Sequence, residues 1–100
     1  MEQDERVQRF LDALEADLPP AESTGALCGC WHALRGEWDA AHDAVQGDTK
    51  DDSWVHAALH REEGDASNAA YWYSRAGRPV PTKPVRQEYL EIAATLLRGS

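Results

Sequence analysis

Three histidines in the middle of the chain have a spacing that suits metal binding. His56 and His60 are four residues apart in a segment with the pattern of a helix, and side chains at that separation share one helix face, ~5–6 Å apart at Cβ. Two neutral imidazoles so placed can bind zinc, copper, iron or nickel when a third ligand comes from elsewhere in the chain. His42 is the first candidate for that ligand and His32 is the second. We therefore predict a site for a divalent transition metal made by His42, His56 and His60.

Two carboxylates extend the same stripe and give the histidines a possible catalytic role. Asp52 stands four residues before His56, and Glu63 stands three residues after His60. Without a metal, either histidine is a candidate general base oriented by its neighbouring carboxylate, because an imidazole titrates near neutral pH. A structural interpretation also stands, in which both histidines are hydrogen-bonded packing residues. The chain contains no GxSxG, P-loop or Gly-rich dinucleotide motif that would favour another chemistry.

Aromatic residues supply candidate binding groups. Tyr71, Trp72 and Tyr73 are consecutive, so on a helix they point in different directions and at least one must reach the surface. Aromatic side chains with a polar tip favour contact with a ligand or partner there. The residues that we predict to contact a peptide, a protein or a small molecule are Trp38, Arg61, Asn68, Tyr71, Trp72 and Arg75.

The polar members of that set also have a simpler interpretation. Arg61 and Arg75 would pair with Glu63 or Asp65, and exposed ion pairs of this kind contribute little to stability. Asn68 would cap the start of its helix.

The composition limits the choice of partner and compartment. Eighteen acidic and ten basic residues among 100 give a net charge of −8, which repels phosphate backbones and anionic lipid. We therefore expect neither nucleic acid nor a membrane as partner. The acidic start, residues 1–5, lacks the basic and apolar regions of a signal peptide. We expect a cytoplasmic protein in which Cys28 and Cys30 are reduced, because cysteines two residues apart rarely form a disulfide.

Apolar residues spaced three and four apart predict an all-α protein. Val7, Phe10 and Leu14 show this spacing near the N-terminus, where Pro19 and Pro20 end the helix. Within the middle of the chain the expected helices span residues 25–35, 37–46, 53–63 and 66–76, with Asp51, Asp52 or Ser53 as the cap of the third. The predicted single helical domain has a capping helix at 4–18, a hairpin at 25–46, a second hairpin at 53–77 and a capping helix at 84–98.

An internal repeat relates the two hairpins. A shift of 28 residues aligns Gly36 with Gly64, Ala41 with Ala69, and His32 with His60. Small residues therefore recur where helices would cross, which is typical of stacked helical hairpins.

The second copy resembles the second half of a tetratricopeptide repeat. The family pattern has a turn glycine, an alanine five residues on, an aromatic four further and an alanine three after that, which here are Gly64, Ala69, Tyr73 and Ala76. Pro81 stands where the closing proline of the family is common. The resemblance covers residues 25–81, although the family period is about 34 residues and a stable stack usually needs three repeats. The terminal helices would then cap the exposed faces.

A second resemblance and the fold together suggest two functions. The stretches GEWDAAH, WVHAALHREEGD and NAAYWYSRAG look like a group of small bacterial proteins of unassigned function. Tetratricopeptide folds imply peptide or protein binding in a concave groove, by fold analogy alone. We expect a small helical binding or interaction module, with a histidine-based metalloprotein or acid–base enzyme as the alternative.

Overall fold

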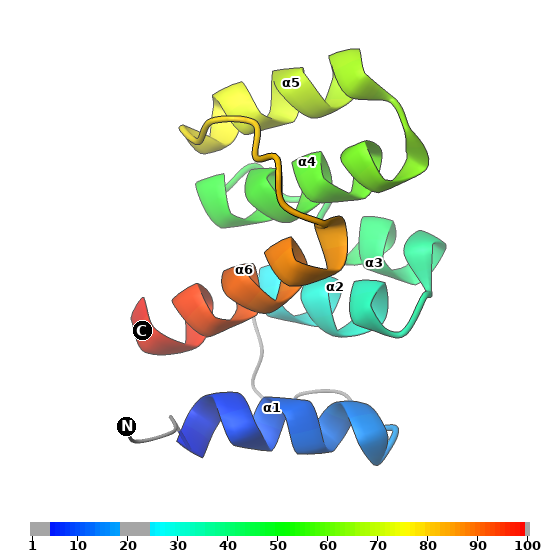
Figure 1. Ribbon diagram of the computed structural model, residues 1–100, viewed down its shortest axis with the longest axis vertical. Helices are drawn as coiled ribbons and strands as arrows, with labels where there is room; N and C mark the ends of the chain where they lie inside the picture. Colours follow the sequence, from blue (N-terminus) through cyan, green and yellow to red (C-terminus); the bar gives the residue numbers. More distant parts are fainter. Residues whose placement is uncertain (1–4, 19–24, 100) are drawn as a thin grey trace.

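The computed structural model describes residues 5–18 and 25–99 and is all helical over these ranges (Figure 1). The helices are α1 (Glu5–Glu15), α2 (Gly25–Leu34), α3 (Trp38–Ala44), α4 (Lys50–Glu63), α5 (Ala66–Ala76) and α6 (Val85–Gly99). Neither described range contains a strand, so the predicted all-α class is confirmed. In the described part of the chain, every helix is too short or too polar to cross a membrane.

Tight turns join α2 to α3 and α4 to α5, and each pair of helices packs together. Gly36 and Gly64 lie in these turns with φ of +77° and +88°. A residue with a Cβ adopts such backbone angles only at a cost in steric energy. The Gly64 N–H donates to the carbonyl oxygens of His60 and Arg61, which closes the last turn of α4. The two glycines that align in the sequence therefore occupy equivalent turns.

Helix α4 starts earlier than the sequence indicated. We expected it to begin at Ser53 with a cap from Asp51, Asp52 or Ser53, but it begins at Lys50. The cap is Thr49, whose side chain accepts a hydrogen bond from the Asp52 N–H. Asp51 and Asp52 then lie in the first turn, where carboxylates interact favourably with the helix dipole.

Helix α4 is the centre of the molecule, and it packs against α2, α3, α5 and α6. Every residue from Ser53 to His60 is buried, so this helix is covered on all sides. Ala41 of α3 and Ala69 of α5 are also buried, at 0% and 2% exposure. Small side chains at these two positions permit close approach of the helices.

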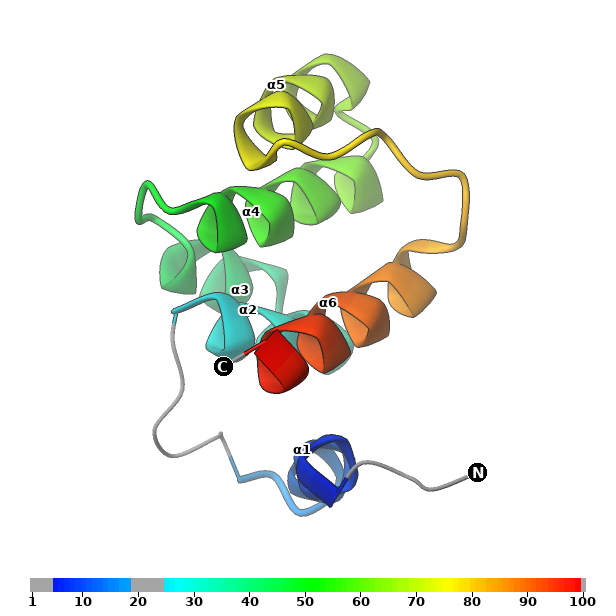
Figure 2. The same ribbon diagram turned by 90° about the vertical axis from the view of Figure 1, so that its left-hand side faces the viewer.

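Helix α6 covers one side of the two hairpins. It packs against both α2 and α4, on the side of α2 that faces away from α3 (Figure 2). It follows that α6 covers the face that the first helices of the two hairpins share, while the outer side of α5 stays open. The last helix can take this position because residues 77–84 form an extended connector without helical structure.

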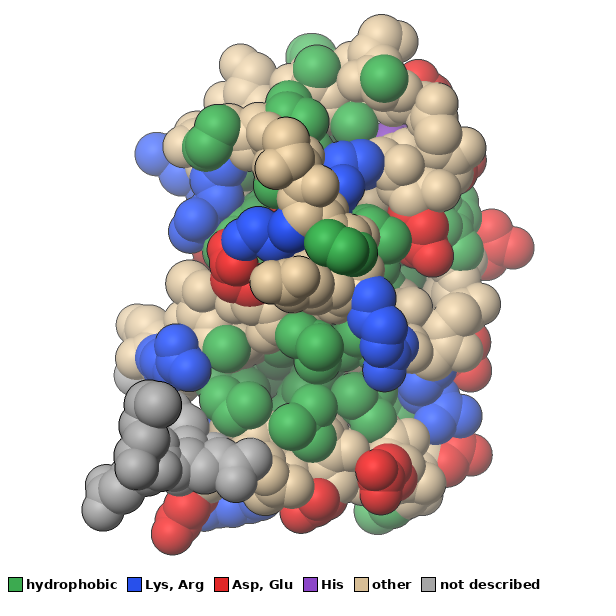
Figure 3. Space-filling view, viewed as in Figure 1, with side chains coloured by type: hydrophobic (Ala, Val, Ile, Leu, Met, Phe, Trp, Pro, Cys, Tyr) green, Lys and Arg blue, Asp and Glu red, His purple; other side chains and the backbone are tan. Residues whose placement is uncertain are grey.

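Helix α1 adds a thin layer beneath α2 and α6. Phe10 is its buried residue, and it ends at Glu15 rather than at Leu18 as the apolar spacing predicted. Figure 3 shows hydrophobic side chains gathered on the surface between α6 and α1.

Neither cysteine forms a disulfide within the described ranges. Cys30 is fully buried, and this burial, reinforced by the charge of Glu88, raises the pKa of its thiol well above the ordinary value. A thiol that stays protonated is a poor nucleophile, so the structure offers no support for chemistry at Cys30.

Candidate functional site: a cluster of three histidines

The histidines predicted to form a metal site lie together between α3 and α4. His42 comes from α3, and His56 and His60 come from consecutive turns of α4. One ring nitrogen of each lies within 4.8 Å of one ring nitrogen of the others. The rings of His56 and His60 stack with centroids 4.9 Å apart, and the His42 ring meets His56 edge-on at 4.5 Å. Two of the three side chains are buried and His42 is half-buried.

Two tryptophans hold this cluster from either side. Trp38 stacks on His42 with centroids 4.9 Å apart and planes 13° apart. Trp72 stacks on His56 at 4.0 Å and 9°. The Trp38 indole is fixed in turn, because its Nε1–H donates to the Leu59 carbonyl oxygen at 2.9 Å. The imidazole planes are therefore held by aromatic packing, and both tryptophans were among the predicted binding residues.

A carboxylate sets the tautomer of His60. Its Nδ1 lies 2.6 Å from Oε2 of Glu63. Because an ionised carboxylate only accepts hydrogen bonds, Nδ1 carries a proton, so in the neutral form of the ring the lone pair is on Nε2. A carboxylate that orients a histidine in this way is the usual outer partner of a metal-binding imidazole.

His42 has a different partner. The Gln46 amide donates to the His42 carbonyl oxygen at 2.7 Å and contacts the His42 Nδ1 at 3.1 Å. With the amide in this orientation Nδ1 accepts, and the ring proton sits on Nε2. Metal binding through Nε2 therefore requires the ring proton to move to Nδ1 and the Gln46 amide to move away from it, because turning the amide over in place would bring its oxygen against the His42 carbonyl oxygen.

His56 has the most unusual environment of the three. Its Nδ1 is buried and makes no hydrogen bond within the described ranges. Burial, followed by the nearby His42 and His60, lowers its pKa from 6.5 to about 4, and the Val45 backbone partly offsets the shift. His56 is thus neutral near pH 7, which is the form that binds a metal. A buried nitrogen without a partner costs about 1–3 kcal/mol, and a metal at Nδ1 would remove that cost.

The lowered pKa of His56 predicts how the metal-free protein responds to acid. Between about 4 and 6.5, the unfolded chain binds a proton at His56 that the folded chain does not. The free energy of unfolding should therefore fall as the pH drops through this window, by on the order of 3 kcal/mol from this residue. Urea unfolding across the window should give a steeper loss for the wild type than for His56→Gln. Parallel curves for the two proteins would contradict the prediction.

Two other members of the predicted stripe lie apart from the cluster. His32 pairs with Glu37 at the end of α2, with Nδ1 and Oε1 2.8 Å apart. Asp52 lies at the start of α4, where it interacts with the Gly47 backbone and the Thr49 side chain. The prediction that Asp52 orients His56 was therefore wrong, because the cap of α4 engages the carboxylate instead. Glu63 is the carboxylate that contacts the cluster.

Three of the predicted binding residues gather on α5. Arg75 donates to the Tyr71 hydroxyl at 3.3 Å, and its guanidinium lies over the rings of Tyr71 and Trp72 at 5.8 and 5.5 Å. The expected pairing of Arg75 with Glu63 or Asp65 was wrong, because the aromatic rings lie one turn away on its own helix. Tyr71 is 54% exposed, as expected for one of three consecutive aromatics.

Asn68 is not the cap of α5. Asp65 is the cap, and its carboxylate accepts hydrogen bonds from the backbone N–H and side-chain amide of Asn68. Asn68 thus has a structural partner at the helix start.

Arg61 points away from the histidines into a buried polar network. It donates two hydrogen bonds to Oε1 of Glu88, at 2.9 and 3.2 Å. The Tyr73 hydroxyl donates to the same carboxylate at 2.7 Å, and the Trp54 indole donates at 3.3 Å. The expected pairing of Arg61 with Glu63 or Asp65 was wrong, because Glu88 is 2% exposed and offers a more enclosed partner.

Sequence reasoning missed Glu88, although a signal was present. Glu88 falls three residues after Val85 and four before Ile92, on the apolar stripe of the last helix. A carboxylate on an apolar stripe must find donors when the stripe is buried. The three donors come from two other helices, α4 and α5, so their identity needed the tertiary structure.

Comparison of the chain with protein-family models, with curated proteins and with solved structures found no match. The functional inference therefore rests on the site's own residues.

Proposed function

We propose that this protein binds a divalent transition metal through His42, His56 and His60. The observation that carries the proposal is the placement of three imidazole nitrogens, from two helices, within 4.8 Å of one another. Three nitrogens at ordinary zinc distances of about 2.0–2.1 Å in a tetrahedral site lie roughly 3.3 Å apart. Nitrogens that lie up to 4.8 Å apart would therefore have to approach one another further when a metal binds.

The chemistry of the donors narrows the choice of metal. Three neutral imidazoles without a thiolate suit zinc, copper or nickel, whereas magnesium and calcium prefer oxygen ligands. Glu63 supplies the outer hydrogen bond that such a site needs at His60. Three protein ligands leave a fourth position for water or an external ligand, and a zinc-bound water ionises near neutral pH.

A direct test is to purify the chain without a tag and without chelators and to measure its metal content. We expect one equivalent of zinc, copper or nickel per chain. The metal-free protein should gain thermal stability when the metal is restored. Ring NMR signals of His42, His56 and His60 should shift on addition, whereas those of His32 should stay in place. Absence of retained metal together with unmoved histidine signals would overturn the proposal.

A protein-interaction module is the second candidate, and the open face of α5 favours it. Tyr71, Trp72 and Arg75 form a connected group there, with Tyr71 54% exposed. We infer that α2–α3 and α4–α5 are tetratricopeptide-like hairpins, which the equivalent turns at Gly36 and Gly64 support. In that architecture α6 covers the shared face of α2 and α4, so a peptide or protein would bind on α5 instead. The thiols of Cys28 and Cys30 fit a reducing, cytoplasmic location.

A further inference from the structure

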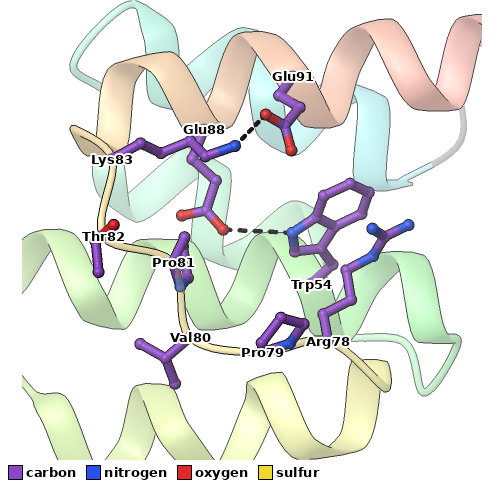
Figure 4. A pocket seen from close by; sticks show the side chains of 9 residues that line it. All are labelled: Trp54, Arg78, Pro79, Val80, Pro81, Thr82, Lys83, Glu88 and Glu91. Atoms are coloured by element: carbon purple, nitrogen blue, oxygen red, sulfur yellow. Dashed lines mark hydrogen bonds and ion pairs between the residues drawn. The ribbon is translucent and has the colours of Figure 1, made fainter.

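A pocket on the other side of α4 lies beneath the connector between α5 and α6. It has a volume of about 360 Å³ and is lined by Trp54, Glu88, Glu91 and the connector residues 78–83 (Figure 4). This volume is within the range of small-molecule sites. Trp54 and His56 are two residues apart on α4, about 200° around the helix axis, so the pocket is separate from the histidine cluster.

The charged groups of this pocket are mostly neutralised by one another. Lys83 pairs with Glu91 across the pocket (Figure 4). Glu88 receives the two hydrogen bonds of Arg61. Arg78 is the exception, because it makes no ion pair with any carboxylate in the described ranges and instead lies over the Trp54 ring, 3.4 Å from the centroid.

Stacking leaves the hydrogen-bonding capacity of Arg78 available. A guanidinium lying over an aromatic ring uses its face, while its N–H donors point outward in the plane. These donors form a fork that matches the two oxygens of a carboxylate. Pro79, Val80 and Pro81 of the connector add apolar surface beside Arg78. The pocket thus combines one open anion-binding group with apolar walls.

We propose that this pocket binds a small organic carboxylate with an apolar body. Its carboxylate pairs with Arg78, and its apolar part lies against Val80 and Pro81 of the connector. The net charge of −8 opposes the approach of anions, so highly charged ligands such as polyphosphates are disfavoured. A ligand with one negative charge gains the Arg78 contact and offsets the repulsion through apolar burial.

The test uses the full chain, freed of metal by chelation and buffer exchange so that a carboxylate cannot act as a metal ligand. Three probes of the same shape are 3-phenylpropanoate, its neutral amide and the cationic 3-phenylpropylamine. NMR of the ¹⁵N-labelled protein follows the indole Nε1–H of Trp54, which donates to Glu88 beside the pocket. We expect the carboxylate to shift this signal saturably, and the amide and the amine to bind at least roughly 10-fold more weakly, because only the carboxylate forms a charge-assisted pair with Arg78.

Variants of Arg78 test whether this residue is the counter-ion of the bound carboxylate. Arg78→Gln should weaken carboxylate binding roughly 10-fold or more, and Arg78→Lys should have a smaller effect because it keeps the charge but loses the fork. Arg9→Gln, at an exposed arginine of α1, should bind as the wild type. Equal binding of the three probes, an unchanged affinity in Arg78→Gln, or a wild-type Kd weaker than about 10 mM would each overturn the proposal. The comparison of probes on the wild type decides the matter even where a variant folds poorly.

Discussion

Replacement of Glu88 by alanine should lower the free energy of unfolding by about 3–5 kcal/mol. The side chain is 2% exposed and accepts hydrogen bonds from Arg61, Tyr73 and Trp54. Without the carboxylate, the Arg61 guanidinium lies next to a cavity with its charge unpaired, and two further donors lose their acceptor. Breaking a buried ion pair by removing one partner has this cost because the remaining charge is desolvated without compensation. A domain of this size has roughly 5–15 kcal/mol of stability in total.

Glu91 provides the matched control for Glu88. It lies one turn further along α6 and pairs with Lys83, but its side chain is 47% exposed. Glu91→Ala should change the free energy of unfolding by less than about 1 kcal/mol, as for other exposed pairs. Chemical unfolding of both variants measures the difference directly. Equal losses in Glu88→Ala and Glu91→Ala would show that burial of the Glu88 network contributes nothing.

The helices could be predicted from the sequence because apolar spacing and turn glycines are local signals. Helix α5 has the predicted bounds, 66–76. Gly64 ends the preceding helix α4 and Gly77 ends α5, each in the left-handed conformation that is typical of a helix C-terminus. The start of α4 was missed because three acidic or hydroxyl residues competed as caps and an earlier threonine took the role. The sequence did not specify which helices α6 packs against, for a different reason. Its apolar stripe shows that one face is buried, but a stripe does not say which helices cover it.

The candidate site also has contacts that could be predicted from the sequence and contacts that could not. His56 and His60 share a face because they are four residues apart, and Glu63 follows on the next turn, so this half of the site was visible in the sequence. His42 and Trp38 come from α3, and Trp72 comes from α5. Trp72 lies against His56 because α5 folds back over α4 at the Gly64 turn. The approach of His42 to the two histidines of α4 was also predicted, whereas the contacts of Glu88 with α4 and α5 were not, because they depend on where α6 packs.

Helix α4 contributes side chains to both proposed sites because it is buried on all sides. His56 and His60 face α3 and α5, while Trp54 and Arg61, seven residues apart and so on one face, meet Glu88 of α6. Each set of polar side chains is enclosed by a different neighbouring helix. A ligand at one site would therefore be recognised independently of a ligand at the other, except through the position of α4 itself.

Substitution of His56 by asparagine should abolish metal binding or weaken it more than 100-fold, beyond the roughly 10–100-fold expected for loss of an outer partner. His56 supplies the buried nitrogen without a hydrogen bond, and two imidazoles on separate helices cannot close a metal site alone. Glu63→Ala should weaken metal binding by only roughly 10–100-fold, because His60 keeps its ring nitrogen. What the variant loses is the carboxylate that fixes the tautomer of His60.

The pair formed by His32 and Glu37 is a control that the chain itself provides. It has the same contact between imidazole and carboxylate, at 2.8 Å, but no neighbouring histidine within reach of a shared metal in the described ranges. His32→Asn and Glu37→Ala should therefore leave metal affinity unchanged in a competition titration against a chelator of known affinity. If all four variants weakened binding alike, the metal would be held by scattered surface groups. If His56→Asn bound as tightly as the wild type, the three histidines would be an aromatic packing cluster between Trp38 and Trp72, and the interaction face on α5 would become the leading function.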